Sequence, residues 1–108
     1  MPRPRKRRAL TREPRPAIYK PAGVPLDELH AVTLLHEELE ALRLADLEGL
    51  SQTEAAEQMG VSRSTFQRIV TQARHQVALA LAEGYALQIE GGTFEVRPPH
   101  PRGPRRQN

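Results

Sequence analysis

The sequence predicts a mainly α-helical domain built on a helix-turn-helix, with a small C-terminal β-hairpin and disordered basic termini. Three observations lead to this fold class. All ten prolines lie in residues 1–25 or 98–104, so residues 26–97 contain no proline to interrupt a helix. Two helix-capping serines, Ser51 and Ser62, flank a short segment that ends at Gly60. The formal net charge of +3 separates into basic ends and an acidic middle.

The charge distribution favours a polyanionic partner. Residues 1–25 carry eight Lys or Arg and one Glu, residues 26–97 carry five Arg and twelve Asp or Glu, and residues 98–108 add three Arg. Basic ends on an acidic body indicate that the ends contact nucleic acid, although purely solubilising tails would have the same composition. Fourteen of the sixteen cations are arginine, which can pair two hydrogen bonds with a phosphate or a guanine edge.

The chain divides into three parts by composition. Residues 1–16 form a basic Arg/Pro-rich arm that we expect to be disordered when free, residues 17–97 form the helix-turn-helix domain, and residues 98–108 form a basic Pro/Arg-rich tail. At the start of the domain, residues 17–20 alternate like a short strand and residues 26–29 could make a helical turn. The segment that follows, residues 32–35, is ambiguous between strand and helix.

Helix signals become clear after residue 36. Three glutamates at 37, 38 and 40 suit the solvated first turn of a helix that Gly49 ends. Ser51 and Glu54 form a capping box at the start of a second, short helix. A third helix capped by Ser62 could run to residue 83 before Gly84.

The last folded element is expected to be a hairpin. Residues 87–90 and 93–96 read as strands, and Gly91-Gly92 between them suits a two-residue hairpin turn.

Residues 52–71 have the spacing of a helix-turn-helix. Ala56 is small where the two helices approach each other, and Gly60 can adopt the positive φ of the turn. Five apolar positions would lock the second helix of the motif across the first: Ala55, Met59, Val61, Phe66 and Ile69. An ordinary helical hairpin without nucleic acid is the plainer alternative.

The outer face of the third helix is the candidate DNA-binding surface. The sequence has no carboxylate between Glu57 and Glu83, so this face could approach phosphates without repulsion. The candidate residues on it are Arg63, Ser64, Thr65, Gln67, Arg68, Gln72 and Arg74, of which those nearest the start of the helix would reach base edges. The candidates on the arm, for phosphates or the minor groove, are Arg3, Arg5, Lys6, Arg7 and Arg8.

These segments closely resemble region 4 of bacterial sigma factors, which recognises promoters. The resemblance lies in EALRL (40–44), LEGLS (47–51), EAA (54–56) and MGVSRSTF (59–66). More narrowly, the chain is identified as a member of the domain of unknown function 134 family, through KPAGVP (20–25), ALRLADLEGL (41–50) and LQIEGG (87–92). The resemblance implies DNA binding. Many members of that family carry cysteines that this chain lacks, so metal or redox sensing is not carried over.

Other chemistry finds no support in the sequence. Cysteine is absent, the four histidines are scattered, and no phosphate-binding glycine loop or nucleophile motif occurs, so we expect neither an enzyme nor a metal or other cofactor. No apolar run approaches the ~20 residues of a membrane span. We therefore expect a cytoplasmic protein.

The leading interpretation is a sequence-specific, double-stranded DNA-binding transcriptional regulator whose third helix enters the major groove. The first alternative is a protein-interaction module that docks on the transcription machinery, with RNA polymerase as a candidate contact. The second is an RNA binder acting through its arginine-rich arms. A homodimer through residues 77–96 is also expected, because residues 77–82 are apolar all round the helix and the expected hairpin can cover only one side. The alternative is that residues 17–20 and the hairpin form one sheet that covers the helix within a single chain.

Overall fold

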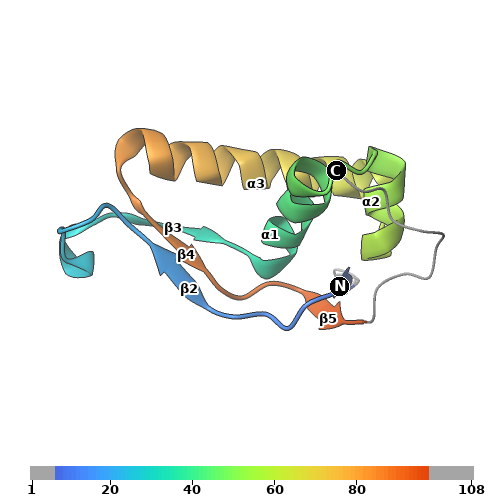
Figure 1. Cartoon of the computed structure of the whole chain (residues 1–108), viewed down its shortest axis with the longest axis horizontal. Coiled ribbons are helices and arrows are strands. Elements are labelled where there is room, and N and C mark those ends of the chain that lie inside the picture. Colours follow the sequence, from blue (N-terminus) through green and yellow to red (C-terminus); the bar gives the residue numbers. More distant parts are fainter. Residues whose placement is uncertain (1–6, 98–108) are drawn as a thin grey trace, which may run out of the picture.

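The computed structural model describes residues 7–97 and contains three helices and a small amount of β-structure (Figure 1). The helices are α1 (His36–Leu42), which continues into the π-helical turn η2 (Arg43–Leu47), α2 (Gln52–Met59) and α3 (Arg63–Glu83), with a 3-10 turn η1 (Leu26–Glu28) before them. The strands are β1 (Arg8–Leu10), β2 (Ala17–Tyr19), β3 (Ala31–Leu34), β4 (Ala86–Ile89) and β5 (Phe94–Val96). About half of the described residues are helical, so the expectation of a mainly α fold was too strong.

Three of the strands form one mixed sheet in the order β2-β4-β3. The central strand β4 pairs antiparallel with β2 and parallel with β3, and α3 lies over one face of this sheet (Figure 1). Leu34 and Ile89 form a small core with Ala73 and Val77 of α3. The ambiguous segment around residue 33 is therefore a strand, because β4 gives it a partner. Farther along α3, Leu81 stays 79% exposed.

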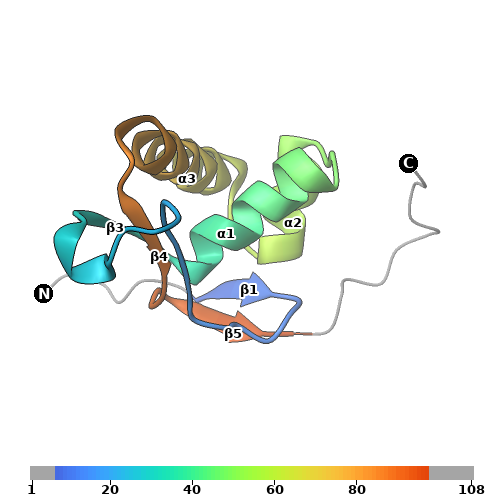
Figure 2. The same cartoon turned by 60° about the vertical axis from the view of Figure 1, so that its left-hand side comes forward.

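The predicted C-terminal hairpin is wrong. Strand β5 does not pair with β4 but runs parallel to β1 in a separate two-stranded sheet, below α1 and α2 in Figure 2. Both edges of β4 are already occupied by β2 and β3, so β5 has no edge of β4 to join. Gly91 and Gly92 both have positive φ, but they carry the chain from one sheet to the other.

The prediction of a disordered N-terminal arm is also wrong for residues 8–10. These residues form β1, in which Ala9 and Leu10 are 1% and 4% exposed. The surrounding arginines and prolines give the segment a composition typical of disorder. Two apolar residues and the available edge of β5 are nevertheless enough to attach it to the rest of the domain. The expectations for residues 1–6 and 98–108 lie outside the described residues.

The glutamates at the start of α1 are buried, whereas a solvated first turn was expected. Glu37, Glu38 and Glu40 are 2%, 8% and 6% exposed. Each has a structural partner: the amide of Thr93 donates to Oε1 of Glu37 (2.9 Å), and the amide of Leu35 donates to Oε1 of Glu38 (2.9 Å). Glu40 accepts from Arg43 (3.0 Å). Glu37 thus ties the segment before β5 to α1 and Glu40 ties η2 to α1, whereas Glu38 caps the start of α1 itself.

Candidate nucleic-acid interface

Helix α2 begins at the capping box that the sequence predicts. The amide of Glu54 donates to Oγ of Ser51 (3.1 Å), and the amide of Ser51 donates to Oε1 of Glu54 (3.0 Å). These two bonds satisfy backbone donors that the helix itself cannot satisfy. The start of α2 is therefore fixed by local sequence.

The turn between α2 and α3 is equally well defined. Gly60 ends α2 in the left-handed conformation (φ 66°), which a residue with a side chain adopts only with strain. The amide of Val61 then donates to the carbonyl of Ala56 (3.0 Å), and Ser62 caps α3 by accepting from the amide of Thr65 (3.1 Å). The turn thus sets the angle at which α3 leaves α2.

Buried apolar side chains hold the two helices together. Ala55, Met59 and Phe66 are fully buried (0% exposed), and Val61 and Ile69 pack partly buried against the same cluster. All five positions that the sequence assigned to this contact are confirmed as packing positions. The cluster also contains Ala41 of α1, Leu44 of η2 and Val70 of α3, so α1 and η2 pack on α2 and α3 as well.

With this face of α3 buried, the predicted outer face is confirmed as exposed. Six of the seven candidate side chains are exposed: Arg63, Ser64, Gln67, Arg68, Gln72 and Arg74. Thr65 is half-buried, and its hydroxyl accepts hydrogen bonds from Ser62 (2.9 Å) and Arg68 (3.2 Å). Thr65 therefore orients its neighbours more than it presents a group to solvent.

Among the described residues, the two arginines nearest the start of α3 have only neutral partners. Nε of Arg63 donates to Oε1 of Gln52 (3.4 Å), and Nη2 of Arg68 donates to Oγ1 of Thr65 (3.2 Å). Within residues 7–97 neither guanidinium forms an ion pair. Their charge is consequently available to an anionic ligand.

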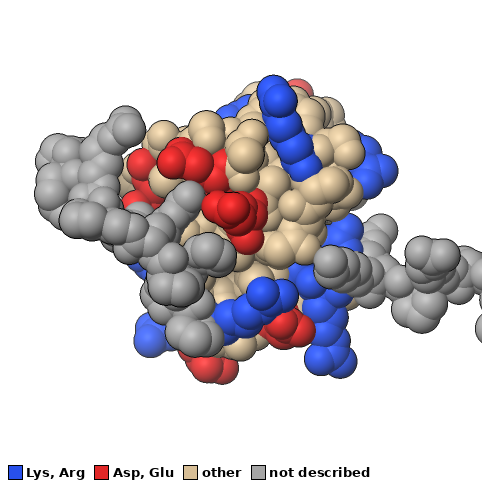
Figure 3. All heavy atoms as spheres, turned by 90° about the vertical axis from the view of Figure 1, so that its right-hand side faces the viewer, with Lys and Arg blue, Asp and Glu red and all other residues tan. Residues whose placement is uncertain are grey.

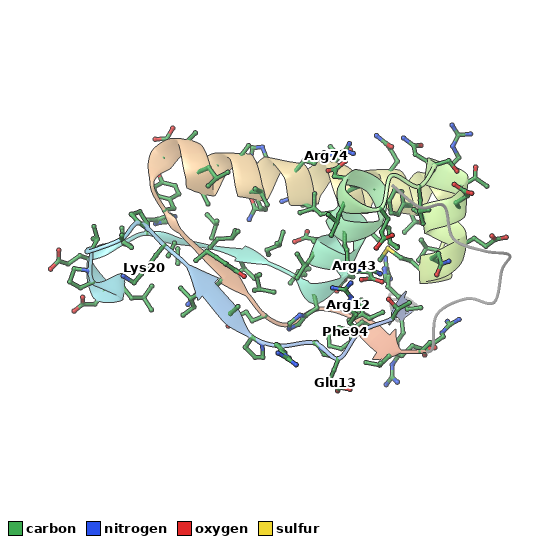
Figure 4. All side chains as sticks on the ribbon, viewed as in Figure 1. Arg12, Glu13, Lys20, Arg43, Arg74 and Phe94 are labelled. Carbon is green, nitrogen blue, oxygen red and sulfur yellow. The ribbon has the colours of Figure 1, made fainter. Side chains whose placement is uncertain are left out.

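One carboxylate from another element reaches this face, which sequence spacing did not reveal. Asp46 of η2 makes a two-bond ion pair with Arg74, with Nη2–Oδ1 and Nε–Oδ2 distances of 2.8 and 3.1 Å. The hydrogen bonds from Arg74 lower the pKa of Asp46 and raise the pKa of Arg74. Figure 4 shows Arg74 on α3 next to α1 and η2. Arg74 is thus a partly neutralised member of the surface.

The arm candidates do not form one uniform group. Arg7 is exposed, but Arg8 is buried in β1 at 9% exposure. The assignment of Arg8 to a DNA-contacting arm is therefore corrected: its side chain lies within the fold because β1 packs against α1 and α2. Arg3, Arg5 and Lys6 lie outside the described residues.

Arg97 is a surface cation that the sequence analysis did not select. It follows β5, yet its guanidinium lies beside the turn between α2 and α3: a methyl group on Gly60 would stand 3.2 Å from Nη2 of Arg97. No local pattern could have indicated this, because the contact depends on the pairing of β5 with β1.

The end of the molecule that carries α2 has both acidic and basic areas. Figure 3 shows one cluster of Asp and Glu side chains in the upper part of this end, whereas Lys and Arg side chains project from the top, the right-hand edge and the bottom, where further Asp and Glu side chains lie among them. Lys and Arg side chains outside the acidic cluster could therefore contact an anionic ligand.

The described residues contain neither a metal-binding cluster nor a membrane-spanning helix. No group of three or more His, Asp or Glu residues in the described part is placed to hold a metal ion. No helix within residues 7–97 is long and apolar enough to cross a membrane.

Comparison with known proteins places the chain in a family. The family model described as "Protein of unknown function DUF134" matches residues 1–97. The chain belongs to this DUF134 family. A relative named as a UPF0251 protein from Dehalococcoides mccartyi is 57% identical over 96 residues, which cover 89% of this chain and 82% of the relative. No solved structure matches the chain.

Other DUF134-like relatives extend the similarity to distant bacteria. The UPF0251 protein of Caldanaerobacter subterraneus is 53% identical over 96 residues, covering 89% of this chain and 81% of its own length. The UPF0251 protein of Rhodospirillum rubrum is 53% identical over 98 residues, which cover 91% of this chain and 68% of the relative. The family expected from the sequence is thereby confirmed. The names of these relatives state no ligand.

Proposed function

We propose that this DUF134 protein is a sequence-specific, double-stranded DNA-binding transcriptional regulator, in which α2 and α3 act as a helix-turn-helix of the sigma region 4 type. The observation that carries the proposal is the exposed outer face of α3. Arg63, Gln67 and Arg68 stand at its start, and α3 itself contributes no carboxylate before Glu83.

The side chains on this face match the chemistry of base recognition. Arg63 and Gln67 are four residues apart, so they lie on the same side of α3, one turn from each other. An arginine can donate two hydrogen bonds to guanine, and a glutamine amide can pair with adenine, in the major groove. An α-helix fits that groove, and recognition helices of this motif enter it by their N-terminal end.

The rigidity of the support favours specific recognition. Arg63 and Gln67 flank Phe66, which is fully buried, so their backbone positions follow from the packing of α3 on α2. Ser62 and Gly60 fix the start of the helix as described above. A base-reading side chain needs such support, because displacement of its backbone would lose both hydrogen bonds of a paired contact.

A selection from random duplex DNA tests this proposal. The full chain is incubated with a random library at moderate salt, and bound duplexes are recovered and sequenced. We expect a defined motif to be enriched. Recovery of duplexes without any shared motif would contradict sequence-specific binding and would leave only phosphate contact.

A second candidate function is docking on a protein of the transcription machinery, such as RNA polymerase. A groove of about 1150 Å³ runs between the segment after β1 and the helices α1 and η2. Its apolar lining includes Leu39 and Leu47, which are 39% and 69% exposed. Exposed leucines beside a groove suit an amphipathic partner helix. This candidate would be favoured if the chain enriches no DNA motif but still binds RNA polymerase, and if Leu47→Asp abolishes that binding.

A further inference from the structure

The pairing of β1 with β5 determines where the basic ends of the chain are attached. The strands run parallel, with Arg8 opposite Phe94 and Leu10 opposite Val96. Residues before β1 therefore join the pair beside Thr93, whose carbonyl accepts from the amide of Arg8 (3.1 Å). Arg97, directly after β5, lies at the other end of the pair, where its amide donates to the carbonyl of Leu10 (2.7 Å).

This pair is held firmly to α1 by buried polar contacts. Besides the bond from Thr93 to Glu37, the hydroxyl of Thr11 donates to Oε2 of Glu40 (3.2 Å) and accepts from Nη2 of Arg43 (2.8 Å). Both ends of the pair are thus tied to the same helix. The position of Arg97 relative to α2 and α3 is therefore set by the fold.

At that position Arg97 lies against the turn that starts α3. A methyl group on Gly60 would lie 3.2 Å from Nη2 and 3.8 Å from Cζ of Arg97, so the guanidinium packs over the turn. The side chain is 47% exposed. Its Nε donates to Oε2 of Glu95 (2.6 Å), and in the described part of the chain its two terminal nitrogens make no hydrogen bond.

We propose that Arg97 is a further nucleic-acid contact, which binds a backbone phosphate beside the turn while α3 occupies the groove. This inference rests on the proposed DNA-binding function and adds a residue to it. When a recognition helix enters the groove by its N-terminal end, the preceding turn comes close to the backbone of one strand. Glu95 fixes one edge of the Arg97 guanidinium, and the two terminal nitrogens can still donate two hydrogen bonds to one phosphate.

The test compares two variants that each remove one positive charge. Arg97→Gln removes the proposed contact, and Lys20→Gln is the control, because Lys20 lies at the far end of the molecule and its Nζ donates to the carbonyl of Val24 (Figure 4). Affinity of each full-length chain is measured across a salt series, on the duplex recovered by selection and on a random duplex.

We expect Arg97→Gln to lower the slope of log affinity against log salt by about 0.9, the value for one phosphate contact. Binding to both duplexes should weaken by the same factor, because phosphate contacts carry no base information. Lys20→Gln should keep the parent slope. Arg97→Lys retains the charge and should keep most of the slope, which separates a phosphate contact from a structural role.

Three results would overturn specific parts of the reasoning. If Arg97→Gln behaves like Lys20→Gln while Arg63→Ala loses affinity, Arg97 is no contact and the proposed function stands. If Arg97→Lys loses as much slope as Arg97→Gln, Arg97 acts through the structure of the turn. If the parent chain binds neither duplex, the proposed function itself fails.

Discussion

Gly92 offers a sharp test of how the two sheets are joined. Its φ of 113° is strained for any residue with a side chain, and a methyl group there would overlap Oε1 of Glu37 and stand 3.1 Å from its Cδ. That oxygen accepts the hydrogen bond from the amide of Thr93. Gly92→Ala should therefore displace a buried carboxylate from its partner as well as strain the backbone.

Gly91→Ala is the matched control. Gly91 also has positive φ (69°), but a methyl group there meets only a leucine carbon at 3.9 Å. A left-handed alanine costs about 1–2 kcal/mol, and this is the whole effect expected at Gly91. At Gly92 the loss of a charge-assisted hydrogen bond adds about 1.5–3 kcal/mol, for a total of about 4 kcal/mol.

The assay is chemical denaturation of both variants, followed by circular dichroism at equilibrium. We expect the free energy of unfolding to fall by about 2.5 times as much for Gly92→Ala as for Gly91→Ala, with unchanged denaturant slopes. Equal losses of unfolding free energy would refute this prediction. They would show that the Glu37 side chain can move away from a methyl group at residue 92 and still accept the hydrogen bond from Thr93.

Three further predictions concern the core, the interface charge and the oligomeric state. Phe66→Ala removes a fully buried aromatic side chain and should cost about 3–5 kcal/mol of stability; a variant that melts like the parent would show that α3 does not pack by this face. Asp46→Asn should change stability by less than about 1 kcal/mol, because the pair with Arg74 is half exposed. The same substitution should tighten DNA binding, because it removes a carboxylate from the proposed interface, and weaker binding would contradict this. The pKa of Asp46 is lowered in the folded state. The small contribution of the Asp46–Arg74 pair to stability is therefore fully present above the ordinary pKa of the carboxyl group and is lost as the pH falls through the lowered pKa of the folded state. Measurements of the free energy of unfolding against pH would detect this loss. Leu81 is 79% exposed on a helix that the sheet covers on one side, so we expect a homodimer that Leu81→Glu dissociates, and sedimentation of the parent as a monomer at micromolar concentration would exclude it.

The helical part of the fold follows closely from local sequence. The Ser51 and Ser62 caps and the left-handed Gly60 and Gly84 depend on residues within one turn of each other, and the structure contains all four. The exposed face of α3 was predictable for the same reason: once Phe66 is assigned to the core, helical periodicity places Arg63 and Gln67 outside. Local chemistry decided these features, so no knowledge of distant contacts was needed.

The β-structure was less predictable, because strand partners are chosen across long sequence distances. Gly91-Gly92 satisfies the chemistry of a hairpin turn, yet β2 and β3 occupy both edges of β4 and leave β5 to β1. Burial of Glu37 and Glu40 is linked to the same event, since their hydrogen-bond partners are Thr93, directly before β5, and Thr11, directly after β1. Asp46 and Arg97 also reach the α3 surface only through tertiary structure. Asp46 does so because η2 lies beside α3, and Arg97 because β5 pairs with β1.

The central claim is that α3 reads base sequence in the major groove. The most direct measurement is the affinity of Arg63→Ala and Gln67→Ala for the selected duplex and for every single-base substitution of it. We expect each variant to lose about 1–3 kcal/mol of discrimination at one base position and to keep the parent's preferences elsewhere. Uniform weakening on all duplexes, with the base preferences of the parent intact, would contradict base reading by α3.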